Sequence, residues 1–154
     1  MRGTDAFLTC IGTSAHERAN DSAHAANLTQ AHLIETLSCI GREHLDIYYL
    51  RVRRAVEEFQ LAGVLEALEM FRQEGHIRFL GLYCDQNGLA ALGAWQFNDS
   101  FEILLTPPKE MSTLEPLARE RRVGILTVGE RVAGHPVLQS VRTEEEVAKA
   151  VAFS

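Results

Sequence analysis

The chain has 154 residues, and its 46% hydrophobic content is enough for one domain, residues 1–154, with a real core. Its 15 Lys and Arg residues stand against 21 Asp and Glu, which gives a net charge of -6. No broadly basic face is therefore expected, and nucleic acid is a poor candidate partner.

The cysteines and the apolar runs indicate the cellular compartment in which we expect the protein. Cys10, Cys39 and Cys84 are widely spaced, odd in number and without a C-x-x-C pair, so neither a disulfide framework nor a zinc site is indicated. The apolar runs have the length of strands, well below the roughly 20 residues of a membrane span, and the N-terminus lacks a signal-peptide pattern. We therefore expect a soluble protein of a reducing cytoplasm, without contact to a membrane.

Short apolar runs alternate along the chain with longer amphipathic segments. The short runs predict strands at residues 5–12, 45–52, 76–84, 101–107 and 123–129. Apolar residues at helical spacing predict helices at residues 28–40, 57–75, 86–96 and 111–122. Thr29 and Gly41 are the expected caps of the first helix. Residues 135–141 predict a short sixth strand, and residues 142–154 a final helix.

The segment 13–27 between the first strand and the first helix is polar and rich in alanine, which predicts a mobile loop. His16, His24 and His32 lie in or just after it. A metal site there would need a rigid scaffold and a carboxylate or thiolate partner. We expect solvated histidines and no metal.

The alternation of strands and helices predicts an α/β fold, since strands that are apolar on both faces suit a parallel sheet covered by helices. The sequence has no G-x-G-x-x-G after the first strand and no G-x-x-x-x-G-K-[ST]. The two common nucleotide-binding fingerprints are therefore missing. The pattern leaves both a doubly wound sheet and part of a barrel open.

Three stretches of the sequence are similar to one known family. They are "CIGREHLDIYYLR" (39–51), "FRQEGHIRFLGLYCD" (71–85) and "LARERRVGILTVGERVAGHPVL" (117–138), and their order and wording resemble the aldo-keto reductases. That family folds as a TIM barrel, which takes about 250 residues. The resemblance places residues 5–12 on the third barrel strand. It implies a partial TIM barrel of five or six β-α units, the third to the eighth, shortened at the N-terminus.

A barrel without its first two strands has open edges and an exposed apolar interior. The resemblance therefore implies a homo-oligomer or a partner chain that covers the edges. It also implies NADP as the family's cofactor, with a tyrosine, lysine, aspartate and histidine around the carbonyl.

The family's catalytic positions are missing or replaced in this sequence. Cys10 stands where the family has its lysine, and Arg51 where it has its histidine, while the aspartate and tyrosine belong to the missing strands. Tyr83 and Cys84 replace the Ser-Asn pair that holds the nicotinamide, and Leu104 and Leu105 stand in the place of a glutamine. The resemblance thus implies no catalytic residues and a loss of reductase activity.

Other residues are candidates for binding. Arg51, Arg53 and Arg54 could form an anion site, because arginine binds phosphate and carboxylate in a bidentate manner. The alternatives are a solvated strand end, or ion pairs with Glu57 and Glu58. Cys10 and Cys84 could have a thiol role, although buried small side chains are the simpler interpretation.

The segment "SVRTEEEV" resembles the family's adenosine-phosphate segment, with Arg142 as a candidate cofactor-binding residue. Three functions remain open. The first is a non-catalytic shortened barrel that acts through an interface. The second is an NADPH-dependent carbonyl oxidoreductase completed by a partner chain, and the third is a binder of small anions.

Overall fold

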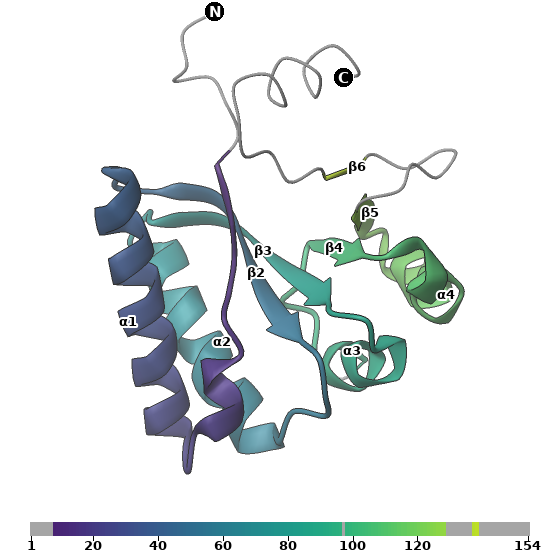
Figure 1. Ribbon diagram of the computed structural model, residues 1–154, viewed down its shortest axis with the longest axis horizontal. Helices are drawn as coiled ribbons and strands as arrows, with labels where there is room; N and C mark the ends of the chain where they lie inside the picture. Colours follow the sequence, from purple (N-terminus) through teal and green to yellow (C-terminus); the bar gives the residue numbers. More distant parts are fainter. Residues whose placement is uncertain (1–7, 97, 129–136, 139–154) are drawn as a thin grey trace, which may run out of the picture.

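A six-stranded parallel sheet forms the centre of the protein in a computed structural model that describes residues 8–96, 98–128 and 137–138 (Figure 1). The strands are β1 (Thr9–Ile11), β2 (Leu45–Val52), β3 (Ile77–Cys84), β4 (Ile103–Thr106), β5 (Gly124–Val128) and β6 (Val137–Leu138). Their order in the sheet is their order in the chain. A doubly wound sheet would reverse its strand order at a switch point, so this succession is that of a barrel.

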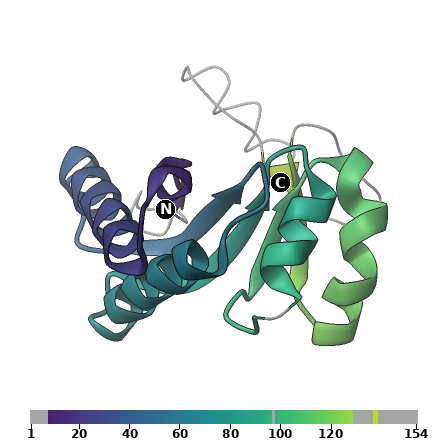
Figure 2. The same cartoon turned by 90° about the horizontal axis from the view of Figure 1, so that it is seen from below.

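In the part of the chain that the structure describes, four α-helices connect the strands, and together they cover one face of the curved sheet (Figure 2). They are α1 (Ser22–Ile40), α2 (Glu58–Gln73), α3 (Gly88–Trp95) and α4 (Met111–Arg121). Short 3₁₀ helices, η2 (Ala15–Arg18) and η3 (Pro108–Glu110), precede α1 and α4. None of the helices in the described residues is long and apolar enough to cross a membrane.

Side chains of β1 to β5 are divided between two apolar clusters, one on each face of the sheet. On β2, Tyr48, Leu50 and Val52 pack with helix residues in the larger cluster, whereas Ile47 and Tyr49 point to the opposite, concave face. All five are at most 4% exposed. Burying one such apolar side chain contributes about 1.5–3 kcal/mol, so both faces of this strand hold the fold together.

The helix that follows β1 starts earlier than the sequence predicts. Asp21 caps α1 by accepting a hydrogen bond of 2.7 Å from the backbone N–H of His24. The expected cap, Thr29, lies inside the helix, and its hydroxyl donates to the carbonyl of Ala25 at 3.0 Å. Gly41 ends the helix as expected, with φ of 65°.

The expectation of a loop over residues 13–27 is therefore wrong for most of that segment, because residues 15–18 and 22–27 are helical; the expected mobility of the segment stays a prediction. The expectation of solvated histidines fails with it. His16 is 3% exposed, and His32 is partly buried on α1 with its Nδ1 2.9 Å from the hydroxyl of Tyr48.

The pairing of α1 with α2 depends on a glycine. A Cβ atom at Gly63 would lie 2.8 Å from the carbonyl carbon of Ser22 and closer still to its oxygen. The same atom would lie 3.0 Å from the Cβ of Ala25. The two helices thus touch backbone to backbone at the first turn of α1.

The remaining predicted elements are confirmed with small shifts of their ends. The sixth strand is present as β6. Residues 5–7 of the first predicted strand and the predicted final helix at 142–154 lie outside the described residues. The prediction of an α/β partial barrel is confirmed.

Candidate functional site

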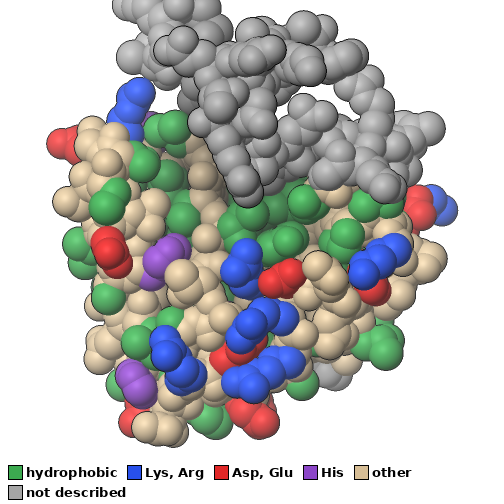
Figure 3. All heavy atoms as spheres, viewed as in Figure 1, with side chains coloured by type: hydrophobic (Ala, Val, Ile, Leu, Met, Phe, Trp, Pro, Cys, Tyr) green, Lys and Arg blue, Asp and Glu red, His purple; other side chains and the backbone are tan. Residues whose placement is uncertain are grey.

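The candidate site lies where the parallel strands end. β1, β2 and β3 run in the same direction, so their carboxyl ends and the loops that follow them meet at one edge of the sheet. In barrels of this kind, the loops at that edge carry the binding and catalytic groups. Cationic side chains gather there beside an apolar patch, over the ends of β2 and β3 (Figure 3).

Arg51 is part of the concave face of the sheet. On β2 it alternates with Leu50 and Val52, which face the helices. Its Nε lies 3.5 Å from Oδ2 of Asp85, and its guanidinium carbon lies 5.5 Å from the centre of the Tyr83 ring. This side chain therefore closes the end of the concave face with a salt bridge and a cation-π contact.

Tyr49 lies on the same face, two residues before Arg51. It is 0% exposed, and within the described part of the chain its hydroxyl has no hydrogen-bond partner. Burial raises the pKa of this phenol to about 12. Its ring occupies the space that a side chain at Gly81 would need on β3. Tyr49 is thus a buried, neutral hydroxyl inside the concave face.

The cysteines point to the other side of the sheet. The thiol of Cys10 lies 3.9 Å from the hydroxyl oxygen of Thr36 on α1, and Cys84 is 0% exposed among the helix-facing residues. Burial raises the pKa of both thiols. Both are therefore neutral, and neither lies on the concave face.

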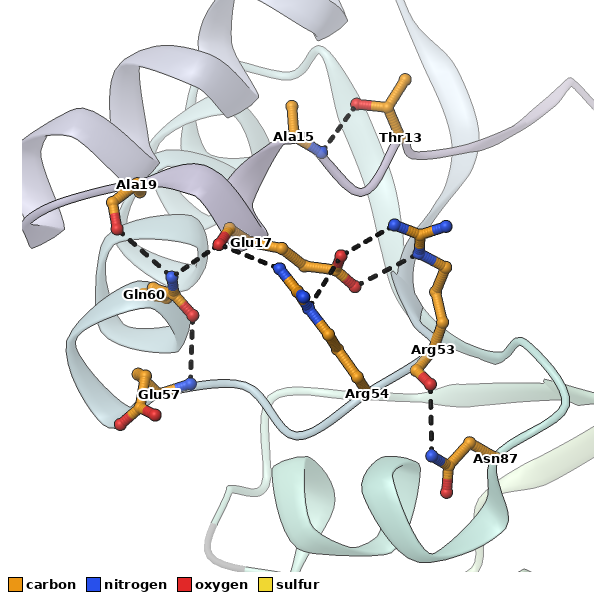
Figure 4. A network of polar contacts seen from close by, with 9 residues as sticks. All are labelled: Thr13, Ala15, Glu17, Ala19, Arg53, Arg54, Glu57, Gln60 and Asn87. Atoms are coloured by element: carbon orange, nitrogen blue, oxygen red, sulfur yellow. Dashed lines mark hydrogen bonds and ion pairs between the residues drawn. The ribbon is translucent and has the colours of Figure 1, made fainter.

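Arg53 and Arg54 follow the end of β2 and pair with a different carboxylate than Arg51 does. Both guanidinium groups converge on Glu17 of η2, whose side chain is only 2% exposed (Figure 4). Nη2 of Arg53 lies 2.9 Å, and Nε of Arg54 3.1 Å, from the same carboxylate oxygen. Arg53 also donates from Nε to the second oxygen at 3.4 Å. The carboxylate thus holds two cations on one side of the loop.

Neighbouring amides fix this arrangement. Nε2 of Gln60 donates to the carbonyls of Glu17 and Ala19, at 3.2 Å each, and Nδ2 of Asn87 donates to the carbonyl of Arg53 at 3.2 Å (Figure 4). The loop after β1 and the loop after β2 are therefore joined by several polar contacts.

A cavity of about 460 Å³ adjoins these residues. Its lining consists of Thr13, Ser14, Ala15, Glu17, Arg18, Arg53 and Arg54. A second, smaller space of about 10 Å³ shares Thr13 and Ala15 with this cavity; it is also lined by His16, His32 and Tyr48 and is large enough for about one water molecule. Burial lowers the pKa of His16, so its ring adds no charge to the larger cavity near neutral pH.

The structure divides the predicted arginine cluster. Arg51 pairs with Asp85, while Arg53 and Arg54 share Glu17, so the three do not form one site. Ion pairs with Glu57 or Glu58, the alternative, are not found within the described residues. Sequence reasoning missed Glu17, since no local pattern marks it as the partner of residues about 36 positions away.

The other predicted site residues can be placed in part. Leu104 packs with the helices, and Leu105 lies on the concave face beside Tyr49. Arg142 lies outside the described residues. Within the described ranges, no three His, Cys, Asp or Glu side chains come together as metal ligands would.

No family model and no curated protein matches this sequence. Solved structures do match, and they are aldo-keto reductases. One from Bacillus halodurans, in its holo form, is 17% identical with a TM-score of 0.66, over 83% of this chain and 44% of that one. One from Brucella melitensis is 12% identical with a TM-score of 0.64, over 82% and 48%. One from Bombyx mori, solved in complex with NADP, is 14% identical with a TM-score of 0.57, over 99% and 52%. The chain spans about half the length of these proteins.

Proposed function

We propose that this chain, which has the fold of part of an aldo-keto reductase barrel, does not reduce carbonyls and acts instead through an interface. Arg51 is the observation that carries the proposal. It stands in the place that the family resemblance assigns to the carbonyl-orienting histidine, faces the concave side and is paired with Asp85.

Carbonyl reduction needs an acid close to the reacting oxygen. An arginine does not give up its proton in proteins, so Arg51 cannot supply it. Tyr49 is the buried hydroxyl on the same face, but its pKa of about 12 leaves it a poor acid, and its hydroxyl has no lysine among its described contacts. Cys10 stands at the family's lysine position and presents a neutral thiol to α1. The described residues thus lack a tuned proton donor.

The described residues also do not fit the nicotinamide of NADP. The family resemblance assigns the binding of its carboxamide to a Ser-Asn pair, and this chain has Tyr83 and Cys84 in that place, at the end of β3. Cys84 is buried towards the helices, and Tyr83 is engaged with Arg51. Leu105, which faces the concave side, has no polar group to offer.

The concave face supports an interface role. The α-helices of the described residues cover the opposite face of the sheet (Figure 2), and within those residues the concave cluster consists of strand residues. Ile11, Phe79 and Ile103 are only partly buried there. Within the described residues, β1 pairs with β2 along one edge and with nothing along the other. Apolar surface next to a free strand edge favours association with a further polypeptide, and we propose a second copy of this chain.

A turnover assay tests the loss of chemistry. NADPH oxidation is followed by absorbance with an aromatic aldehyde and with a quinone, next to an active aldo-keto reductase as the positive control. We expect no oxidation above the protein-free rate and no protection of the chain by NADPH in thermal unfolding. Turnover that scales with protein concentration would refute the proposal in favour of an NADPH-dependent oxidoreductase.

Light scattering across a hundredfold range of concentration tests the interface separately. We expect a mass above that of the 17.2 kDa chain, falling on dilution. Replacing Phe79 by Glu on the concave face should shift the equilibrium to the monomer, whereas Leu89→Glu on α3, where Leu89 is 76% exposed, should not. A wild-type monomer at all concentrations would contradict the interface.

A further inference from the structure

The cavity at the ends of β1 and β2 has a local excess of positive charge. Three arginines, Arg18, Arg53 and Arg54, line it, against the single carboxylate of Glu17. The chain as a whole carries a net charge of -6, so the surroundings of this cavity differ in sign from the average of the protein. Such a local field attracts anions even to an acidic protein.

Arg53 and Arg54 keep N–H groups that do not contact Glu17. The contacts of Arg53 come from Nε and Nη2, and those of Arg54 come from Nε and Nη2 as well. Within the described residues, the Nη1 group of each arginine and the whole guanidinium of Arg18 have no partner. These donors are available to an oxygen-bearing ligand, since a guanidinium offers five N–H groups.

The carboxylate of Glu17 also holds Arg53 and Arg54 in an orientation that suits ligand binding. Glu17 is 2% exposed on its side chain, while those of Arg53 and Arg54 are 53% and 63% exposed. The two arginines thus have one fixed end against a buried group and one open end towards the cavity (Figure 4). Side chains held in this way lose less conformational freedom when they bind a ligand.

We propose that this cavity binds the phosphate or carboxylate group of a small organic anion through Arg18, Arg53 and Arg54, with the hydroxyls of Thr13 and Ser14 as further donors. A volume of about 460 Å³ is larger than one oxyanion needs and lies in the usual range of small-molecule pockets, roughly 300–1,000 Å³. The ligand therefore has an organic part besides its charged group. Arg51 belongs to the concave face and takes no part in this site. The site does not depend on whether the barrel reduces carbonyls.

Calorimetric titration at low ionic strength tests the site, with inorganic phosphate, glycerol 3-phosphate and succinate as probes and glycerol as the uncharged comparison. We expect glycerol 3-phosphate or succinate to bind, more weakly as salt is added, and glycerol not to bind. The two charged probes separate a phosphate-binding site from a carboxylate-binding one. Failure of all three anions to bind would overturn the proposal.

Single substitutions test whether the anion binds in this cavity. Arg54→Gln should weaken the best probe by about tenfold, which corresponds to the loss of one charge-assisted contact. Because Arg54 also contacts Glu17, Arg18→Gln is the safer variant, since it leaves the contacts of Glu17 intact and should weaken binding with no change in thermal stability. Arg119→Gln on α4, where the side chain is 78% exposed and pairs with Glu115, is the matched control. If both Arg18→Gln and Arg54→Gln bound the best probe as tightly as the wild-type chain does, this location of the site would be refuted.

Discussion

Replacing Gly63 by alanine should destabilise the protein, although alanine is the better helix former. In the middle of a helix, this change favours folding by about 0.5–1 kcal/mol. At Gly63 the new methyl group would lie 2.8 Å from the carbonyl carbon of Ser22 and closer still to its oxygen. These are backbone atoms of the first turn of α1, which cannot rotate away as a flexible side chain can.

The collision therefore has to move one helix against the other. Overpacking of this kind costs typically about 1–3 kcal/mol, which exceeds the gain in helix propensity. We expect a net loss of about 1–2 kcal/mol. For a chain of this size that lowers the melting temperature by roughly 2–8 °C.

Gly93 provides the matched control, because it lies in α3 and a Cβ atom there would meet nothing within 4 Å. Gly93→Ala should stabilise the protein by up to about 1 kcal/mol. Urea unfolding followed by circular dichroism measures both variants. If Gly63→Ala were as stabilising as Gly93→Ala, the close contact of α2 with the start of α1 would be wrong.

Three other changes test separate parts of the structure. Arg121→Gln should lower the free energy of unfolding by about 2 kcal/mol in urea, because the guanidinium donates to the carbonyls of Trp95 and Asn98 at 2.7 and 2.8 Å; an unchanged midpoint would contradict these contacts. Tyr49→Phe should raise the melting temperature, since it removes a buried hydroxyl without a described partner, and a loss of about 1 kcal/mol would reveal one. Burial lowers the pKa of His16 below its ordinary 6.5, so on acidification the unfolded chain takes up the proton before the folded chain does. The free energy of unfolding therefore falls as the pH drops below about 6.5. His16→Asn should flatten this pH dependence, measured by urea midpoints at several pH values.

The order and type of the elements could be predicted because each carries its own periodicity. Leu45–Val52 is a strand in sequence and structure alike, and Gly41 and Gly75 mark helix ends through their positive φ. The start of α1 was missed because its first turns hold mostly alanine and polar residues, which resemble a loop. Its actual cap, Asp21, carries the same kind of signal as Thr29, and only packing against Gly63 decides between them.

The site was less predictable than the fold. Arg51 and Arg53 have the spacing of residues on one face of a strand, but β2 ends at Val52, so Arg53 leaves the sheet and turns to Glu17. Nothing in the sequence fixes that end point to a single residue. Glutamate side chains are seldom buried without a partner, and the partners of Glu17 come together only in the tertiary structure.

The strand order of the sheet has a consequence for how the protein is made. Every strand lies next to the strand that precedes it in the chain, from β1 to β6. During synthesis each new β-α unit can therefore dock on the unit before it as soon as it leaves the ribosome, without waiting for a distant segment. From β1 to β6, the described part of the sheet can thus assemble strand by strand in the order of synthesis.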